Sequence, residues 1–564
     1  MTYNGGMAHY SHPCTRGPFV FPNKRTRVAS WPNAAKVLSA MVWLIFPLTL
    51  ALAITRQSLW TDEGFTVWFA SHQSFHSFFA SVIGSRGAPG DPQFIFYLLY
   101  MREWIRLLGT SELLLRAANI PFAVILVYTM SWASRRFFWN ANLWALFCLS
   151  PFFWFYLNEA RPYVALIAFS SVASVALLAY LIEPERYHAT APWFCLIALF
   201  IAWGMHILAI FLGPALLVLV AITTVRDPKR RQDFLSHWLR PMLCCLPAFL
   251  SLGMFYVWVS ANGVNKPEGN PGITNLVFAL YEFTGFAGLG PPRNDIRQNP
   301  HLAVFLPYWP LLLLGTVALV AAVISVFQTT PSRIVRNVLV AVAVGLGVAL
   351  VFSQWEHFQV LGRHLAALFP LTLVIGMLPP KKRGSPPRSR VAGISFIALA
   401  LVWGISDFRL VFLHNYEKDS YREACSIALA RARQDGAVIL WAADPVTAKY
   451  YGLKVNPAEF GKREVGSGEA FLAAGWSADQ ARAYIAGSSA PTILVLGKAD
   501  PFDYKRGWTG LLEEQPPAQI ARLNAFSIFE WHGPMDTSCP ACSNQAPAAD
   551  LVVESSSRSN SSLD

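Results

Sequence analysis

Long apolar segments recur along this chain and alternate with shorter polar loops. A membrane-spanning helix needs about 20 mostly apolar residues, because backbone groups cannot stay unpaired in hydrocarbon. Eleven segments meet this description, with 191–225 divided near Gly204–His206: 37–55, 111–131, 141–157, 162–182, 191–205, 207–225, 241–260, 303–327, 338–353, 364–380 and 391–406. The pattern predicts a polytopic α-helical membrane protein.

Two regions depart from this pattern. Residues 93–108 are apolar but contain three charged residues, which is typical of a helix that lies on the membrane surface. After residue 407, a helix over 421–434 and strands over 437–441, 491–496 and 527–531 predict a small α/β domain. The Ser-rich end of the chain is expected to be disordered.

Composition supports the membrane class. Only 14% of the residues are charged and 54% are hydrophobic, whereas a soluble domain has about 25% charged residues. The net charge of +12 could suggest a nucleic-acid partner, but the basic residues cluster in loops between apolar segments, at 135–136, 226–231 and 381–383. They are better explained by membrane orientation, and no nucleic-acid partner is expected.

The positive-inside rule then assigns each part of the chain to a side. Residues 1–36 form a cytoplasmic tail, and the first apolar segment is an uncleaved signal anchor. The predicted membrane domain covers 37–406 and has an external loop over 56–110. An extracytoplasmic α/β domain over 407–536 and a tail over 537–564 follow it. We expect an integral protein of a bacterial inner or plasma membrane, with its C-terminus outside.

The cysteines suggest little chemistry. Cys539 and Cys542 form a CxxC pair near the C-terminus. Two cysteines cannot complete a four-ligand zinc site, so a disulfide or inert thiols are favoured over a metal or redox role.

Three short segments at the external ends of spans carry candidate chemistry. Asp62 and Glu63 follow the first span directly, where two adjacent carboxylates are costly unless they are solvated or used. Glu159 and Arg161 lie in a tight hairpin, and by themselves they are better explained by a mutual ion pair than by a functional role.

The third segment, residues 354–364, reads QWEHFQVLGRH. Arg363 and His364 begin a predicted helix, where free amides favour an anion, but interfacial anchoring or an ion pair with Glu356 is an alternative. His206 has no evident partner, so a structural role is the default.

The order of these motifs resembles the large superfamily of membrane glycosyltransferases with the C-type fold. Residues 59–70 (LWTDEGFTVWFA), 92–99, 109–116, 158–163 (NEARPY) and 361–370 (LGRHLAALFP) occupy the places of its characteristic segments. The protein mannosyltransferases that use dolichyl-phosphate-mannose and the bacterial aminoarabinose transferases of lipid A are the most similar groups. The resemblance covers roughly 37–380. It departs where His-Pro-Pro is Asp91-Pro92-Gln93 and where Arg-Tyr is Arg363-His364.

The resemblance implies transfer of a hexosyl or pentosyl group from a polyprenyl-phosphate sugar to an extracytoplasmic lipid, glycan or protein, with inversion. It places the base on Asp62. Glu63 would orient the acceptor or Asp62, or assist a divalent metal; no cofactor is otherwise implied. Arg363 is the first candidate for the donor phosphate, followed by Arg161 and His364.

Further residues in the matching segments are candidates for substrate binding: Asp91, Glu159, Tyr163 and Arg116. Two other functions compete with glycosyl transfer. A transporter or flippase of lipid-linked saccharides would typically show repeat symmetry and charges near the membrane midplane, neither of which is evident. The other is a non-catalytic subunit that binds a lipid or partner through the α/β domain.

Overall fold

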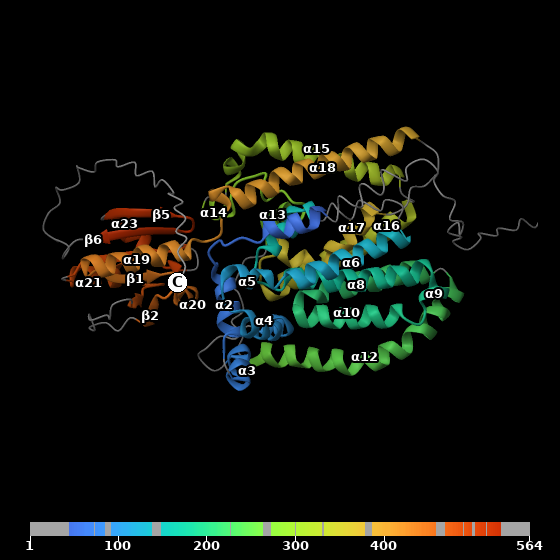
Figure 1. Ribbon diagram of the computed structural model, residues 1–564, viewed down its shortest axis with the longest axis horizontal. Helices are drawn as coiled ribbons and strands as arrows, with labels where there is room; N and C mark the ends of the chain where they lie inside the picture. The colour runs from blue at the N-terminus through green and yellow to red at the C-terminus, as the bar shows by residue number, and fades with distance from the viewer. Residues whose placement is uncertain are drawn as a thin grey trace, which may run out of the picture. The chain divides into compact units, whose positions relative to one another are not determined.

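The computed structural model describes most of the chain between residues 44 and 531 (Figure 1). The described ranges are 44–72, 74–84, 92–137, 148–225, 227–262, 272–298, 301–329, 332–377, 386–457, 469–488, 490–498, 502–514 and 516–531. The chain divides into two compact units, Met1–Arg422 and Glu423–Asp564. Each is considered by itself.

The first unit is helical. After a helix over Leu44–Ala53, its N-terminal half contains α2 (Thr61–Ala70), α3 (Phe75–Ile83), η1 (Pro92–Phe94), α4 (Ile95–Leu108), α5 (Glu112–Ala117), α6 (Ile120–Phe137), α7 (Pro151–Leu157), α8 (Tyr163–Ile182), α9 (Pro184–Tyr187) and α10 (Ala191–Met205). Its remaining elements are η3 (Ile207–Phe211), α11 (Leu212–Thr224), α12 (Pro228–Asn262), α13 (Ile273–Phe283), α14 (Arg293–Gln298), η4 (Leu302–Tyr308), α15 (Trp309–Thr329), α16 (Ser332–Glu356), η5 (Gly362–Leu368), α17 (Phe369–Met377), α18 (Pro386–Phe412) and η6 (His414–Tyr416).

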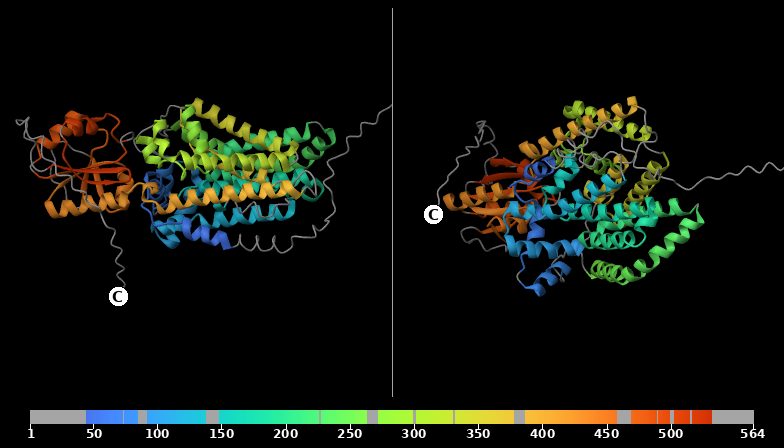
Figure 2. Two further views of the ribbon diagram at one scale, coloured as in Figure 1. Left: turned by 90° about the horizontal axis from the view of Figure 1, so that it is seen from above. Right: turned by 45° about the vertical axis from the view of Figure 1, so that its right-hand side comes forward.

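Helix α8 lies at the centre of this unit. It packs against α6 and α10, and α10 packs against α12, so that long helices run side by side in Figures 1 and 2. Nearly every residue of α8 is buried, because its sequence is apolar or small on all sides. Pro162 precedes its first turn and Pro184 follows its last, which delimits the helix.

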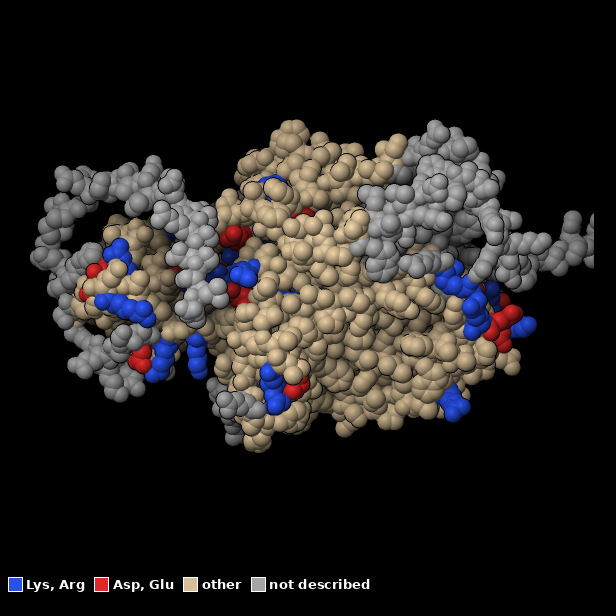
Figure 3. Space-filling model, in the orientation of Figure 1, with Lys and Arg blue, Asp and Glu red and all other residues tan. Residues whose placement is uncertain are grey.

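Seven helices of the described residues are long and apolar enough to cross a membrane: Glu112–Ser134, Tyr163–Ile182, Ile207–Thr224, Pro228–Val259, Leu302–Ser325, Val335–Glu356 and Ile394–Phe412. Leu44–Ala53 and Ala191–Met205 are shorter apolar helices. Figure 3 shows that the face of this unit turned to the viewer is largely uncharged. Large apolar side chains of α12, such as Met254 and Val257, are exposed, as expected of side chains that meet lipid.

A polytopic helical membrane protein is therefore confirmed, whereas the number of eleven spans stays a prediction. The predicted break near Gly204–His206 is observed, because α10 ends at Met205. The predicted span over 141–157 falls partly outside the described residues, and its described part is the short α7. The predicted span over 364–380 begins as the 3₁₀ turn η5 and continues as α17. The helix expected over 93–108 is observed as α4, in which Phe94 at the N-cap and Tyr97 are buried; its position on the membrane surface stays a prediction.

The second unit is an α/β fold, as predicted. A six-stranded sheet has the order β2-β3-β1-β4-β6-β5, in which β6 and β5 are antiparallel to their neighbours and the other pairs are parallel. The strands are β1 (Val438–Ala442), β2 (Lys454–Pro457), β3 (Glu469–Leu472), β4 (Thr492–Leu496), β5 (Ala518–Leu523) and β6 (Phe526–Trp531). Helices α19 (Tyr421–Asp435), α20 (Pro445–Tyr450), α21 (Ala478–Ala486) and α23 (Gly507–Glu514) accompany them.

The strands β1, β4 and β6 match the three predicted strands closely. Leu440 of β1 pairs with Leu494 of β4, and both lie in an apolar core that includes Trp508 and Trp531. Cys539 and Cys542 lie outside the described residues, so their role stays a prediction.

Candidate active site

The two carboxylates at the start of α2 have different surroundings. Asp62 and Glu63 are consecutive in the first helical turn, so their side chains point in directions about 100° apart. The Glu63 side chain is fully buried, whereas that of Asp62 remains 28% exposed. Asp62 is therefore the carboxylate of this pair that can meet a ligand.

Glu63 is the centre of a buried network. Its Oε1 accepts hydrogen bonds from Arg116 Nε at 3.1 Å, from the Ala160 amide at 2.8 Å and from Lys418 Nζ at 3.1 Å. Its Oε2 accepts from Arg116 Nη2 at 2.9 Å and from the Trp60 amide at 3.3 Å. Burial raises the pKa of the Glu63 carboxyl, but Arg116 and Lys418 outweigh this effect and lower it to about 2. Glu63 is therefore a charged anchor.

Arg116 and Lys418 connect Glu63 to other segments. Arg116 also donates to the carbonyl oxygens of Thr55, Gln57 and Ser58, at 3.0, 2.6 and 3.1 Å, and its side chain is fully buried. Lys418 also donates to the carbonyl oxygen of Asn158. Burial lowers the pKa of Lys418 to about 8, although Glu63 opposes the shift. These contacts hold together the start of α2, helix α5 and the hairpin before α8.

The hairpin residue Arg161 supports the same turn. Its Nη1 donates to the carbonyl oxygen of Asp62 at 3.2 Å and to Thr66 Oγ1 at 3.1 Å. Its guanidinium lies 4.5 Å from the centre of the Phe94 ring. The described contacts of Arg161 thus position the backbone of Asp62.

Glu159 does not pair with Arg161 through its side chain in the way that the hairpin sequence allowed. Its carboxylate is buried and Oε2 has no hydrogen-bond partner. Burial raises the pKa of the Glu159 carboxyl to about 7; Lys418 acts against this shift and Glu63 adds to it. A carboxyl that titrates near neutral pH thus lies close to the buried anchor.

Arg363 and Asp62 meet across 301 positions of sequence. Nη1 of Arg363 lies 2.8 Å from Oδ2 of Asp62, and the two side chains are 23% and 28% exposed. Arg363 also lies 5.9 Å above the ring of Trp60 and within electrostatic range of Tyr163, which is buried next to Tyr156. The structure therefore brings the predicted base and the predicted phosphate ligand together at one partly exposed position.

The two histidines of this region make structural contacts. Nδ1 of His364 accepts the Leu361 amide at 3.0 Å, and its ring packs edge-on against Phe358. Nδ1 of His206 accepts the Leu208 amide at 3.2 Å, and its ring stacks on Tyr163. The Leu361 amide is thus not free for an anion, contrary to the expectation from its place at a helix start.

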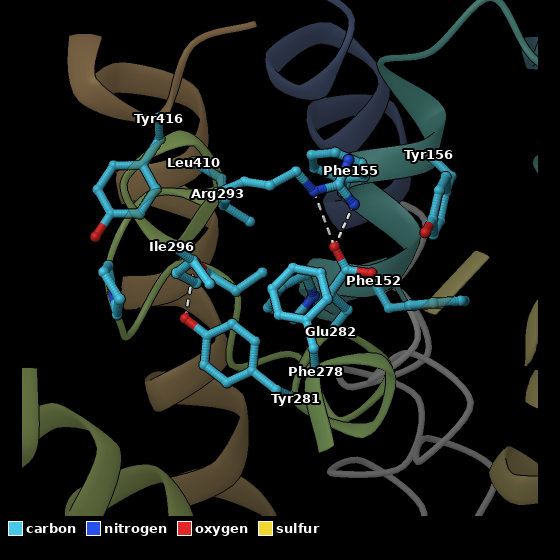
Figure 4. A pocket seen from close by; sticks show the side chains of 13 residues that line it. Phe152, Phe155, Tyr156, Phe278, Tyr281, Glu282, Arg293, Ile296, Leu410 and Tyr416 are labelled. Atoms are coloured by element: carbon cyan, nitrogen blue, oxygen red, sulfur yellow. Dashed lines mark hydrogen bonds and ion pairs between the residues drawn. The ribbon is translucent and has the colours of Figure 1, made fainter. Parts of the chain in front are cut away.

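Glu282 and Arg293 line a pocket together with aromatic side chains (Figure 4). Phe152, Phe155 and Tyr156 contribute to its wall, and the hydroxyl of Tyr156 has no hydrogen-bond partner. Glu282 and Arg293 point toward one another in this pocket, with Arg293 Nε 3.0 Å from Glu282 Oε1. The other carboxylate oxygen, Oε2, accepts the Gly362 amide at 2.9 Å.

Sequence reasoning missed Lys418, Glu282 and Arg293. Lys418 follows the last span in an ordinary polar stretch, and Glu282 and Arg293 lie in a predicted loop, so no local signal distinguished them. Asp91 lies outside the described residues. In the described part of the chain, no group of three His, Cys, Asp or Glu residues could hold a metal ion.

No family model and no curated protein matches the sequence of this chain, whereas solved structures match its fold. ArnT from Cupriavidus metallidurans in the apo state is 13% identical over 88% of this chain and 98% of its own, with a TM-score of 0.48. The same protein bound to undecaprenyl phosphate is 14% identical over 89% and 98%, with a TM-score of 0.41. Arabinofuranosyltransferase AftD from Mycobacteria is 14% identical over 88% of this chain and 40% of its own, with a TM-score of 0.37. This chain is thus similar in structure to ArnT and to AftD.

Proposed function

We propose that this protein is an integral membrane glycosyltransferase that moves a sugar from a polyprenyl-phosphate donor to an acceptor hydroxyl. The observation that carries the proposal is the contact between Asp62 Oδ2 and Arg363 Nη1 at 2.8 Å. The sequence motifs resemble those of enzymes that carry out this reaction. The charge distribution of the loops favours an active site and a C-terminus on the extracytoplasmic side.

The chemistry needs a base for the acceptor hydroxyl and a cation for the leaving phosphate. An acceptor hydroxyl is a weak nucleophile, and a positioned carboxylate accelerates its attack by about 10²- to 10⁴-fold. Asp62 is suited to this role because it is partly exposed, whereas Glu63 is fully buried and paired. Glu63 keeps Asp62 in place through the first turn of α2.

The leaving phosphate needs a positive charge as its own negative charge increases. Arg363 supplies it, because a guanidinium has five donors and can hold a phosphate oxygen and a carboxylate together. A donor phosphate bound there would share the guanidinium with Asp62 and weaken its contact with Oδ2, which can then take the proton of the acceptor hydroxyl. In-line attack by the deprotonated hydroxyl forms the new glycosidic bond, breaks the bond to phosphate oxygen and inverts the anomeric carbon.

The sugar and the acceptor are not specified by these contacts. Hexosyl and pentosyl donors are both consistent with them, and the acceptor is a lipid, a glycan or a protein. The resemblance makes polyprenyl-phosphate-mannose and polyprenyl-phosphate-aminoarabinose the first donors to test.

The experiment is sugar transfer by purified protein in detergent, with radiolabelled donors and an extract of bacterial envelope as acceptor. Transfer without a sealed vesicle distinguishes an enzyme from a flippase. Asp62→Asn is expected to lower turnover by about 10²- to 10⁴-fold. Glu185→Gln is the control, because Glu185 is an exposed carboxylate beyond the far end of α8. Near-normal turnover by Asp62→Asn would end the assignment of the base.

A further inference from the structure

The turn that carries Arg363 is held from a helix that is distant in sequence. Glu282, near the end of α13, is almost fully buried, and its Oε2 accepts the Gly362 amide at 2.9 Å. The first amides of a helical turn have no partner within the turn itself. Here the Leu361 amide is satisfied by His364 and the Gly362 amide by Glu282. The second contact comes from 80 positions away.

The carboxylate of Glu282 is itself held in place. Its other oxygen, Oε1, accepts hydrogen bonds from Nε and Nη2 of Arg293. Arg293 is in turn placed by the Phe155 ring, whose centre lies 4.8 Å from its guanidinium carbon (Figure 4). One carboxylate therefore connects α14, on one side, to the backbone immediately before Arg363, on the other.

Packing around this contact leaves little freedom. Ala279 of α13 lies in one buried cluster with Val360 and Leu365, which flank the turn on either side. A Cβ on Gly362 would approach the Cβ of Glu282 to 2.7 Å. The backbone position of residue 362 is therefore determined by α13, and the guanidinium of the next residue reaches Asp62 from that position.

We propose that Glu282 is a positioning residue, which fixes the Arg363 guanidinium beside Asp62 by binding the Gly362 amide. This role rests on the proposed function of Arg363 as the ligand of the donor phosphate. It extends that function to a residue that contacts neither Asp62 nor Arg363 in the described hydrogen bonds.

A double-mutant cycle tests the proposal. Binding of an undecaprenyl phosphate without sugar is measured for full-length wild-type protein, Glu282→Ala, Arg363→Ala and the double variant, with undecaprenol as the phosphate-free control ligand. We expect Glu282→Ala to weaken binding about tenfold or more, the usual effect of losing a charge-assisted hydrogen bond. If Glu282 acts through Arg363, the double variant binds no more weakly than Arg363→Ala. Multiplied losses in the double variant would overturn the proposal.

Two more variants separate geometry from charge and from general destabilisation. Glu282→Gln keeps a carbonyl oxygen for the Gly362 amide and is expected to retain most of the affinity. Thr284→Ala is the matched control two positions along the chain, because its hydroxyl bonds back to Leu280 and Tyr281 within its own segment. Equal losses in Glu282→Gln and Glu282→Ala would show that the amide contact does not matter.

Hydrogen–deuterium exchange provides a readout that does not depend on the donor. The peptide containing Gly362 should exchange faster in Glu282→Ala than in wild type, while peptides of α8 exchange at the same rate. Unchanged exchange of that peptide would contradict the positioning role even if the protein is inactive. Faster exchange in a protein that binds no polyprenyl phosphate would instead support the contact and reject the proposed function.

Discussion

Lys418 and Glu63, 355 positions apart, form an ion pair in which Nζ lies 3.1 Å from Oε1. The Lys418 side chain is 9% exposed and that of Glu63 is fully buried. This pair joins the segment after α18 to the first turn of α2, directly beside Asp62. The stability of the candidate active site therefore depends on a residue that follows the last span.

Replacing Lys418 should destabilise the first unit. Removing one partner of a buried ion pair costs about 3–5 kcal/mol, and because Arg116 still pairs with Glu63 we expect about 3 kcal/mol for Lys418→Met. Thermal unfolding in detergent measures the loss. Arg106→Met is the control, since Arg106 and Glu103 are 61% and 55% exposed and such pairs contribute about 0–1 kcal/mol. Similar losses of stability in both variants would show that the buried Lys418 pair contributes no more than an exposed ion pair.

Glu159 should make stability depend on pH. Burial raises its pKa from 4.5 to about 7 in the folded protein. Between these values the folded state keeps a proton that the unfolded state has released, so stability falls as the pH rises through this window. Relative to Glu159→Gln, the wild type should lose roughly 3 kcal/mol between pH 4.5 and 7. Parallel pH curves of unfolding for the two proteins would contradict the shifted pKa.

Arg363 should contribute more to the chemical step than a surface cation. Losing one donor to a developing negative charge typically lowers turnover by about 10²- to 10³-fold, which we expect for Arg363→Ala. Arg363→Lys keeps the charge without the planar guanidinium, so its turnover should lie between those of the wild type and Arg363→Ala. Initial rates at saturating donor, using the transfer assay above, measure the difference. Wild-type turnover by Arg363→Ala would show that Arg363 does not bind the donor phosphate.

Gly362 should not tolerate a side chain. In Gly362→Ala the new Cβ would meet the Cβ of Glu282 at 2.7 Å and its Oε2 at 2.8 Å, so the turn or α13 must shift. Overpacking of this kind costs about 1–3 kcal/mol, and turnover should fall as Arg363 moves. Gly347→Ala is the matched control, because nothing lies within 4 Å of its Cβ position in α16. Full activity in Gly362→Ala would show that the turn adapts without displacing Arg363.

Much of the secondary structure could be predicted from local patterns. The apolar runs, the break before His206 and the strands β1 and β4 were evident, because burial in lipid or between parallel neighbours imposes uninterrupted apolar segments. The antiparallel strand β6 was evident from its aromatic and β-branched residues. The strands β2, β3 and β5 were missed. The edge strands β2 and β5 are polar on much of their length, and β3 has only four residues, so none of them shows the pattern that identifies a buried strand.

The candidate site was predicted in part. Asp62 and Arg363 were identified, and the structure brings them together. Glu63 was expected to orient the acceptor or Asp62, or to assist a metal, and Arg116 was a candidate for substrate binding. In the structure these two side chains pair with one another and are fully buried. A motif gives the order of such residues but not the direction in which each side chain points from its helix.

By itself the sequence determined the membrane class and the positions of most apolar helices, because each depends on composition within a short segment. The choice of Asp62 and Arg363 came instead from the order of motifs that resembles a known superfamily. The tertiary structure decided which carboxylate is buried, that Lys418 completes the anchor, and that Glu282 holds the turn before Arg363. These contacts join residues 80 to 355 positions apart. Pairing over such separations depends on how the helices pack, and local patterns in a single sequence do not reveal that packing.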